Sequence, residues 1–425
     1  MNTKKINDIA RRLGPGLITG AADDDPSGIA TYSQAGSQFR FGLVWTLLLT
    51  TPLMIGIQML SARIGWVTQE GLGANIAKIC PRWLTLSLIA LLVTANTINI
   101  AADLAAMGEA VQLLTGGHIS AYIIGFGLLS IAGQVYFSYE GTVRILKWLT
   151  LALFSYVAVI LSVSVPWHQV IYESITPWNY VPEGTSLNDY ASIVVAVLGT
   201  TISPYLFFWQ AAQEVEDNLR RPGAAELRSN PEYAAEHLAR IKGDTYVGML
   251  FSNVIALCIV LATAVTLNAH GITNILTSAQ AAEALKPIAG DFAFVVFSLG
   301  IIGTGLLAVP VLAGSAAFAV SEVLGWKAGL SHGFHDARGF YVIIIAATAL
   351  GAIMGSLEVD PIKALVWSAI INGIISVPIM FVMMRIGQSE DIMGELTITP
   401  RHQFLGWTAT GVMTLAVGFM LVTSL

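Results

Sequence analysis

Long apolar stretches separated by short polar segments run through the whole chain. A membrane-spanning helix needs about 20 mostly apolar residues. Segments of that kind lie at 13–38, 43–66, 84–114, 120–138, 146–165, 190–215, 245–268, 292–322, 339–356, 362–386 and 403–424. The pattern therefore predicts an all-α polytopic membrane protein with eleven transmembrane helices.

The composition agrees with a chain that lies mostly in a bilayer. Of its 425 residues, 55% are hydrophobic and 11% are charged, and the mean hydropathy is +0.70, whereas a soluble domain is about 25% charged. The net charge of −6 argues against a nucleic-acid partner, which would require a basic surface. Cys80 and Cys258 are too few for a disulfide framework or a zinc site. We expect membrane lipid around the chain, no nucleic acid, no cofactor and no obligatory protein partner.

Basic residues are distributed unevenly between the two sides of the predicted bundle. With the N-terminus in the cytoplasm, the inner segments hold eighteen of the 21 Lys and Arg residues, and the outer ones hold Arg40, Lys286 and Lys363. Positive residues are enriched in cytoplasmic loops. We therefore expect a multi-pass protein of the plasma (inner) membrane, with a cytoplasmic N-terminus and an extracytoplasmic C-terminus.

Two of the predicted spans are interrupted by polar residues and a proline. The first contains Gly20-Ala-Ala-Asp-Asp-Asp-Pro-Ser-Gly28, and the sixth contains Leu198-Gly-Thr-Thr-Ile-Ser-Pro-Tyr205. Corresponding interruptions in two halves are typical of inverted-repeat transporters, whose substrate binds where the broken helices meet. We expect a 5+5 inverted repeat with discontinuous helices 1 and 6. Its parts would be a cytoplasmic N-terminus (1–12), a first repeat (13–165), an extracellular loop (166–189), a second repeat (190–386) with a cytoplasmic loop (216–243), and a cytoplasmic link with helix 11 (387–425).

The prolines indicate which backbone oxygens become available at the breaks. A proline has no N–H to donate to the carbonyl four residues earlier. Pro26 therefore frees the carbonyl of Ala22, and Pro204 frees that of Thr200. Carbonyl oxygens at the C-terminal end of a half-helix also carry the negative end of the helix dipole, and Asp25 follows the first of them. The pocket should attract a cation rather than an anion.

Other polar residues at bilayer depth are weaker candidates. Asp23 and Asp24 precede Asp25, but successive helical residues point about 100° apart, so we expect these two to hold the ion's waters or line its path. Asp103 in the third span is a candidate for a proton site, an ion path or a packing hydrogen bond. Among the membrane-depth amides Asn96, Asn99 and Asn372, which usually bond across helices, Asn372 is a candidate for the outer shell of the ion.

The chain resembles the NRAMP family of divalent-metal transporters, which have the leucine-transporter-type fold. The resemblance covers nearly the whole chain and rests on four segments: Leu13-Gly-Pro-Gly16 leading into Asp25-Pro26, Gln58-Met-Leu-Ser-Ala-Arg-Ile-Gly65, Asp103-Leu-Ala105, and Leu198-Gly-Thr-Thr-Ile-Ser-Pro204. It implies that Asp25 and the backbone oxygen of Thr200 bind the transported metal. Thr200 is also the residue whose carbonyl Pro204 frees.

The chain departs from the family at several ion-site positions. The family's first-helix signature Asp-Pro-Gly-Asn is Asp25-Pro26-Ser27-Gly28 here, so that Gly28 replaces an asparagine ligand. The sixth-helix signature ends Met-Pro-His in the family. Here Ser203 replaces the methionine ligand, and Tyr205 replaces the histidine linked to proton transfer. In the third span, Ala106 stands where the family has a glutamate.

These substitutions change the chemistry that the resemblance implies. A thioether favours manganese, iron and later transition metals over magnesium, whereas Mg²⁺ takes oxygen ligands and keeps several waters. We expect a secondary transporter that imports Mg²⁺ as a partly hydrated ion by alternating access, with weak or no proton coupling. This pattern resembles the NRAMP-related magnesium transporters of bacteria. The expected ion site is Asp25, Thr200, Ser203, Gly28 and Ala22, with Asp24, Asp23, Tyr205, Asn372 and Asp103 along the path or in the outer shell.

Three alternatives remain. One is a proton-coupled Mn²⁺ or Fe²⁺ transporter of the same family that tolerates Ser203. Another is a sodium-coupled amino-acid carrier of the same fold, which the acids at the first break disfavour because they would repel a carboxylate. The third is an intramembrane aspartyl protease using Asp25 and Asp103, although the chain lacks a Gly-x-Gly-Asp element.

Overall fold

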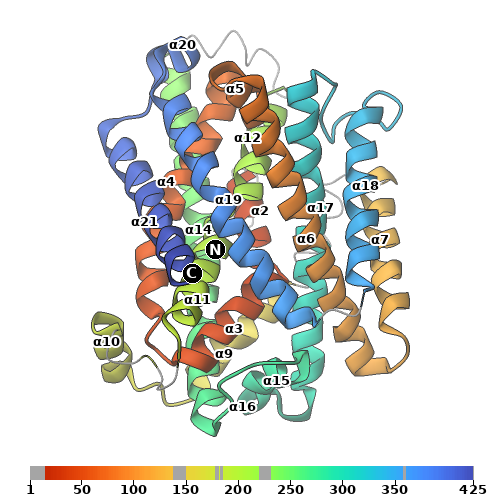
Figure 1. The fold of residues 1–425 in the computed structure, drawn as a ribbon, viewed down its shortest axis with the longest axis vertical. Helices are drawn as coiled ribbons and strands as arrows, with labels where there is room; N and C mark the ends of the chain where they lie inside the picture. The colour runs from red at the N-terminus through yellow and green to blue at the C-terminus, as the bar shows by residue number, and fades with distance from the viewer. Residues whose placement is uncertain are drawn as a thin grey trace, which may run out of the picture.

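The computed structural model describes residues 15–136, 150–177, 181, 185–219, 231–357 and 360–424, and this part of the chain is helical with no strand. The α-helices form one upright bundle (Figure 1). They are α2 (Pro15–Asp23), α3 (Pro26–Phe39), α4 (Val44–Thr68), α5 (Leu72–Ile79), α6 (Arg82–Thr115), α7 (Ile119–Tyr136), α9 (Phe154–Ser162), α10 (Trp167–Ile175), α11 (Leu187–Thr201), α12 (Pro204–Leu219), α14 (Pro231–Thr266), α15 (Ser278–Ala282), α16 (Lys286–Ala289), α17 (Ala293–Leu324), α18 (Arg338–Gly355), α19 (Pro361–Gln388), α20 (Glu390–Met393) and α21 (Pro400–Thr423).

Each of the eleven expected spans coincides with helix in the described residues. Nine helical segments there are long and apolar enough to cross a membrane, and the pair Leu151–Ser162 and Trp167–Ile175, bent by 108°, makes ten. The first expected span, formed by α2 and α3 with 9 and 14 residues, is not in that count, and every 18-residue stretch of it contains the three aspartates 23–25. The prediction of an all-α polytopic membrane fold is confirmed.

Both predicted helix breaks are present at their prolines. The first half-helix α2 ends at Asp23, and α3 begins at Pro26. In the sixth span α11 ends at Thr201, and α12 begins at Pro204. Proline is well suited to the first position of a helix, where no intrahelical N–H bond is required, so each proline ends one half-helix and starts the next.

Glycines allow the half-helices to approach their neighbours closely. A Cβ atom added to Gly20 of α2 would overlap the main chain of Gly248 in α14. A Cβ added to Gly199 of α11 would likewise overlap the main chain of Ala369 in α19. The N–H of Gly16 also donates a hydrogen bond to Oδ2 of Asp244 in α14 (2.6 Å). Both first half-helices are therefore packed backbone to backbone, as small residues permit in membrane bundles.

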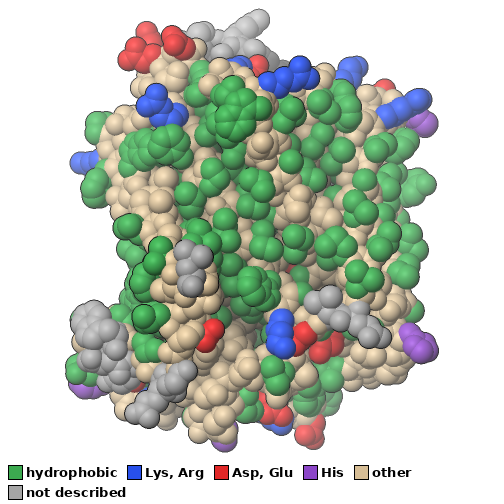
Figure 2. Space-filling view, in the orientation of Figure 1, with side chains coloured by type: hydrophobic (Ala, Val, Ile, Leu, Met, Phe, Trp, Pro, Cys, Tyr) green, Lys and Arg blue, Asp and Glu red, His purple; other side chains and the backbone are tan. Residues whose placement is uncertain are grey.

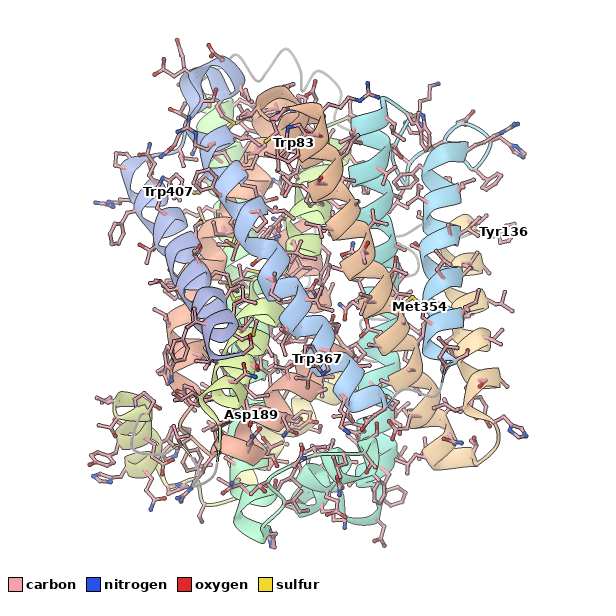
Figure 3. All side chains as sticks on the ribbon, in the orientation of Figure 1. Trp83, Tyr136, Asp189, Met354, Trp367 and Trp407 are labelled. Atoms are coloured by element: carbon pink, nitrogen blue, oxygen red, sulfur yellow. The ribbon has the colours of Figure 1, made fainter. Side chains whose placement is uncertain are left out.

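The outer surface has the pattern of a membrane protein. In the view of Figure 2, apolar side chains cover the middle of the bundle, and most Lys and Arg side chains lie near its upper edge. Trp83 and Trp367, labelled in Figure 3, are 69% and 62% exposed and lie toward the upper and lower parts of this face. Exposed tryptophans at such positions are typical of the two membrane interfaces.

Some of the expected segments lie partly or wholly outside the described residues. The N-terminal segment 1–12 does so completely, as do residues 220–230 of the loop expected at 216–243. Also outside are residues 137–149, at the end of the fourth span and the start of the fifth. The same holds for residues 178–180 and 182–184 of the loop expected at 166–189. The described end of the 216–243 loop is helical, because α14 begins at Pro231 and runs directly into the seventh span.

Candidate functional site

The carboxylate of Asp25 lies at the break between α2 and α3 and accepts hydrogen bonds on both oxygens. Oδ1 accepts from the N–H of Gly28 (2.7 Å) and from the Ser27 hydroxyl (2.8 Å), which makes Asp25 the N-cap of α3. The helix dipole and the free N–H groups favour a negative charge there. Oδ2 accepts from Nδ2 of Asn99 in α6 (3.1 Å) and from the Tyr205 hydroxyl in α12 (3.4 Å). One carboxylate thus joins three helices.

Hydroxyl groups from the sixth span bond to both carbonyl oxygens that the prolines free. The Tyr205 hydroxyl donates to the oxygen of Ala22 (3.2 Å), which Pro26 leaves without its helical partner. The Ser203 hydroxyl donates to the oxygen of Thr200 (2.9 Å) and to that of Gly199 (2.7 Å). Buried carbonyl groups require a partner. Here the partners are Ser203 and Tyr205, which are the residues by which the chain departs from the family signature.

Gly28 brings the two breaks into contact. A Cβ atom added to Gly28 would lie 3.2 Å from Oγ1 of Thr200 and 3.3 Å from the carbonyl oxygen of Asp23. Such separations are tighter than ordinary van der Waals contact. The absence of a side chain at Gly28 therefore keeps the first turn of α3 against the end of α11.

The three consecutive aspartates point to different neighbours. Asp25 is bonded toward α6 and α12, whereas Asp23 and Asp24 share the hydroxyl of Ser252 in α14, at 2.5 and 3.2 Å. Oδ1 of Asp23 and Oδ2 of Asp24 have no hydrogen-bond partner among the described residues. The acidic triplet therefore divides into one group at the junction of the two breaks and two groups on the side of α14.

Polar residues of α6 and α19 extend the site. The amide oxygen of Asn99, whose nitrogen holds Asp25, accepts a hydrogen bond from the Ser368 hydroxyl in α19 (2.8 Å). Asp103 lies one turn beyond Asn99, and Asn372 lies one turn beyond Ser368. Because α6 and α19 run in opposite directions (Figure 1), these two residues lie on opposite sides of the Asn99–Ser368 bond. Both are buried, and their side-chain polar atoms have no hydrogen-bond partner in the described part of the chain.

The sequence did not single out Asn99 or Ser252 as site residues. Asn99 was one of three amides at membrane depth, and Asn372 was the one selected for the outer shell. The structure brings Asn99 rather than Asn372 to Asp25. The available signal was its spacing, because Asn99 lies one helical turn before Asp103 and so shares its face of the third span. Ser252 has no comparable signal in its own segment.

The junction is closed on every side. Ala22, Asp25, Thr200 and Ser203 are each 2% exposed or less. Tyr205, which covers the carbonyl of Ala22, is likewise buried. A solute can therefore reach these oxygens only after helices move apart.

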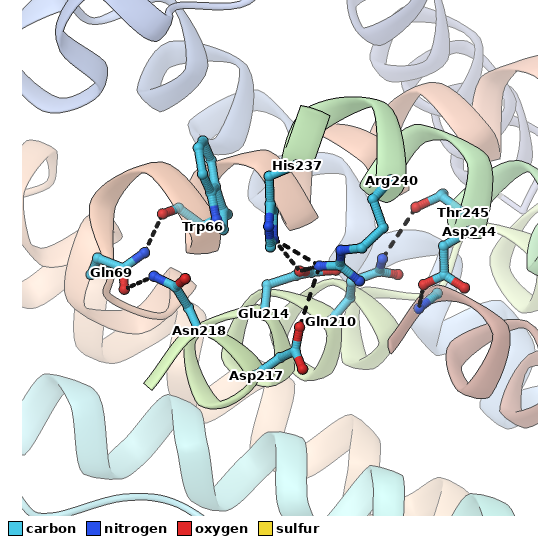
Figure 4. Close-up of polar contacts among 11 residues, drawn as sticks. Trp66, Gln69, Gln210, Glu214, Asp217, Asn218, His237, Arg240, Asp244 and Thr245 are labelled. Carbon is cyan, nitrogen blue, oxygen red and sulfur yellow. Dashed lines mark hydrogen bonds and ion pairs between the residues drawn. The ribbon is translucent and has the colours of Figure 1, made fainter. Parts of the chain in front are cut away.

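A second polar cluster joins α12 to the first part of α14 (Figure 4). Oε2 of Glu214 accepts a hydrogen bond from Arg240 (2.6 Å), whose guanidinium also lies 3.5 Å from Asp217 and contacts His237 (2.8 Å). The His237 ring stacks on Trp66 of α4 at 4.8 Å between ring centroids. Donor atoms of Glu214, Asp217 and His237 lie within 4.8 Å of one another. Since the Arg240 guanidinium already provides the positive charge, we interpret the cluster as an ion-pair network.

Comparisons with known proteins agree with this architecture. A divalent metal cation transporter MntH of Caldanaerobacter subterraneus subsp. tengcongensis is 23% identical over 432 aligned residues, which cover 99% of this chain and 95% of the relative. The crystal structure of the Eremococcus coleocola manganese transporter in complex with an aromatic bis-isothiourea compound superposes with a TM-score of 0.73 at 17% identity, covering 96% of this chain and 85% of that one.

A second structural neighbour, also at low sequence identity, shares the fold. The structure of MhsT in complex with L-phenylalanine has a TM-score of 0.56 at 11% identity and covers 97% of this chain and 98% of its own. The family model for natural resistance-associated macrophage protein-like sequences, Nramp, matches residues 16–423. Because that match includes both broken helices and almost all of the remaining chain, this protein belongs to the Nramp family.

Proposed function

We propose that this chain carries a divalent metal cation across the membrane and binds the ion between its two helix breaks. The observation that carries the proposal is the position of Asp25. Its buried carboxylate lies beside the Ala22 carbonyl, and the same Tyr205 hydroxyl bonds to both. An acidic side chain at bilayer depth is costly, and such residues mark functional sites such as ion pathways. The names of the transporter relatives support the same class of substrate.

The donor set is composed of oxygen atoms. Around Asp25, the groups able to face a cation are the carbonyls of Ala22 and Thr200 and the hydroxyls of Ser203 and Tyr205. Asn99 presents its amide nitrogen to Asp25. Hydroxyl groups both donate and accept, so turning the O–H hydrogens of Ser203 and Tyr205 away would leave oxygen lone pairs facing an arriving ion. Neither sulfur nor imidazole is present among these groups.

This chemistry supports Mg²⁺ as the preferred ion. Mg²⁺ is held by one or two carboxylates together with waters that it releases reluctantly. Asp25 supplies the carboxylate, and the hydroxyl and amide groups suit contacts to the ion's waters. Asp23, Asp24, Asp103 and Asn372 would then lie along the path or in the outer shell.

Mn²⁺ is the second candidate. It accepts oxygen ligands as Mg²⁺ does, and a structural neighbour is named a manganese transporter. In this chain Ser203 stands in place of the family's methionine, and Tyr205 stands in place of its histidine. The soft ligand and the proton-linked group are therefore missing. We therefore propose weak or no proton coupling for this chain, with a coupled Mn²⁺ or Fe²⁺ carrier as the alternative.

Alternating access fits the closed junction. The first repeat, 13–165, and the second, 190–386, would move relative to each other around the ion, and 387–425 would add a link and helix 11. The uneven distribution of basic residues supports an N-terminus in the cytoplasm, and hence a C-terminus outside, in the plasma (inner) membrane.

Uptake by proteoliposomes tests the proposal directly. Mg²⁺ and Mn²⁺ are offered separately while trapped indicators report metal entry and internal pH. We expect Mg²⁺ to enter without acidification and Asp25→Ala to abolish its entry. Glu283→Gln, an acid-to-amide change in a surface ion pair with Lys286, is the matched control and should transport normally.

Two outcomes would replace the proposal. Mn²⁺ entry with internal acidification and no Mg²⁺ entry would identify a proton-coupled transition-metal carrier. Sodium-stimulated amino-acid uptake, with neither metal entering, would identify an amino-acid carrier of the same fold.

A further inference from the structure

A pocket with a volume of about 190 Å³ lies between α4, α14 and the segment leading into α21, away from the helix breaks. Its polar wall consists of Arg63, Lys242 and His402, and the rest of its lining is apolar, including Met59, Leu238 and Ile398. None of the described residues that line it is acidic. With histidine neutral, the pocket therefore carries a charge of +2 from Arg63 and Lys242.

Each of the three polar side chains keeps donors for a ligand. Arg63 donates through Nε and Nη2 to the carbonyls of Leu396 (3.0 Å) and Thr397 (2.9 Å), and a guanidinium has five N–H groups in all. This bonding fixes the guanidinium at the pocket wall. Lys242 is exposed and lies over the ring of Tyr246 at 5.9 Å. His402 uses only Nδ1, toward Thr399 (2.7 Å).

Apolar side chains of α14 beside the pocket reach the outer surface of the bundle. Tyr246 and Leu250 lie one and two turns after Lys242, on the same face of α14, and are 43% and 50% exposed. Exposed apolar side chains of a membrane-spanning helix face lipid chains. A molecule in this pocket would thus contact cations at one end and a lipid-facing surface at the other.

We propose that this pocket binds an anionic phospholipid, with the phosphate group at Lys242, His402 and Arg63 and an acyl chain along the apolar surface of α14. Basic pockets between transmembrane helices are suited to acidic lipid headgroups. A free anion would use the cationic end but leave the apolar wall uncovered. A zwitterionic lipid would place its own positive group against Lys242 and Arg63. The proposal concerns a surface separate from the helix breaks and does not depend on the transported ion.

Thermal unfolding in detergent with added lipid tests this assignment. Phosphatidylglycerol and phosphatidylcholine with the same acyl chains are titrated against the full-length protein, and inorganic phosphate is titrated in parallel. We expect phosphatidylglycerol to raise Tm in a saturable manner, because a ligand of the folded state stabilises it. Phosphatidylcholine and inorganic phosphate should leave Tm unchanged.

Lys242→Gln is the decisive variant, because its side chain makes no ion pair with any residue that the structure describes and the variant should fold. It should raise the half-saturating amount of phosphatidylglycerol about fivefold, and His402→Gln should raise it further in combination. Lys327→Gln, a matched change at an exposed lysine outside the pocket, should have no effect. Native mass spectrometry should show one tightly retained phosphatidylglycerol that Lys242→Gln releases.

Three results would overturn the assignment. Equal stabilisation by the two lipids would show that the headgroup charge is not recognised. Equal weakening in Lys242→Gln and Lys327→Gln would reduce the effect to general surface charge. Full stabilisation by inorganic phosphate would show that the pocket binds a free anion and does not require a lipid.

Discussion

The hydroxyl of Tyr205 donates hydrogen bonds both to the carbonyl oxygen of Ala22 (3.2 Å) and to Oδ2 of Asp25 (3.4 Å). One side chain of α12 thus bonds to the carbonyl of α2 that Pro26 frees and to the acid that follows this half-helix. The position that carries a proton-linked histidine in the family here connects the two broken helices.

Tyr205→Phe should weaken this connection without changing the volume of the side chain by much. It leaves the buried Ala22 oxygen without a donor, which costs about 1–3 kcal/mol. We expect a lower Tm in detergent and an altered apparent affinity for Mg²⁺ in proteoliposomes. Tyr246→Phe, at an exposed tyrosine of α14, is the control. An unchanged Tm in Tyr205→Phe would show that the hydroxyl contributes little to the junction.

Ser203→Met should change which ion is preferred. The thioether would replace a hydroxyl in the break between α11 and α12 and add the soft ligand that favours Mn²⁺ over Mg²⁺. We expect the ratio of Mn²⁺ to Mg²⁺ uptake to rise by about tenfold, equivalent to about 1.4 kcal/mol. The measurement is competition between the two ions in the same proteoliposomes, with Ser203→Ala as the variant that removes the hydroxyl alone. If Ser203→Met and Ser203→Ala behaved alike, the soft-ligand explanation would be wrong.

The sequence predicted the parts of the fold that depend on local chemistry. Apolar length locates the spans, and Pro26 and Pro204 locate the breaks, because a missing N–H acts on the residue four positions earlier in the same helix. The consequence that the Ala22 and Thr200 oxygens need partners also follows from local chemistry. Local chemistry does not indicate that both partners come from the sixth span. Ser203 is three residues from Thr200, whereas Tyr205 is 183 residues from Ala22.

Contacts between distant segments could not be derived in this way. The spacing of Asn99 and Asp103 shows that they share a helix face, but not which other helix that face meets. Likewise, the angular separation of Asp23, Asp24 and Asp25 predicts that they diverge, and only the packing of α2 against α14 identifies Ser252 as the group that receives two of them. The metal-binding roles of these residues stay predictions.

Glu214→Gln should destabilise the closed arrangement of α12 and α14. Glu214 is fully buried and accepts from Arg240, so the change removes the buried acid of the pair and leaves the guanidinium with the partly exposed Asp217. Loss of a charged partner at such a site costs about 1–3 kcal/mol, whereas an exposed pair such as Glu283 and Lys286 contributes about 0–1 kcal/mol. Comparing the Tm of Glu214→Gln and Glu283→Gln checks the difference. Equal Tm values for the two variants would show that the ion-pair network of Glu214 and Arg240 does not stabilise the fold more than an exposed pair does.

Gly20→Ala should disturb the packing of α2 against α14. The added Cβ would overlap the main chain of Gly248, which cannot move aside as a flexible side chain could. Overpacking of this kind costs about 1–3 kcal/mol, and because α2 carries Ala22 it should slow uptake as well as lower Tm. Gly243→Ala is the matched control on the facing helix, since a Cβ there meets no atom within 4 Å. Full transport by both Gly20→Ala and Gly243→Ala would show that the transport cycle does not require close packing of α2 on α14. The hydrogen bonds of Tyr205 and Ser252 would then have to maintain the closed junction around Asp25.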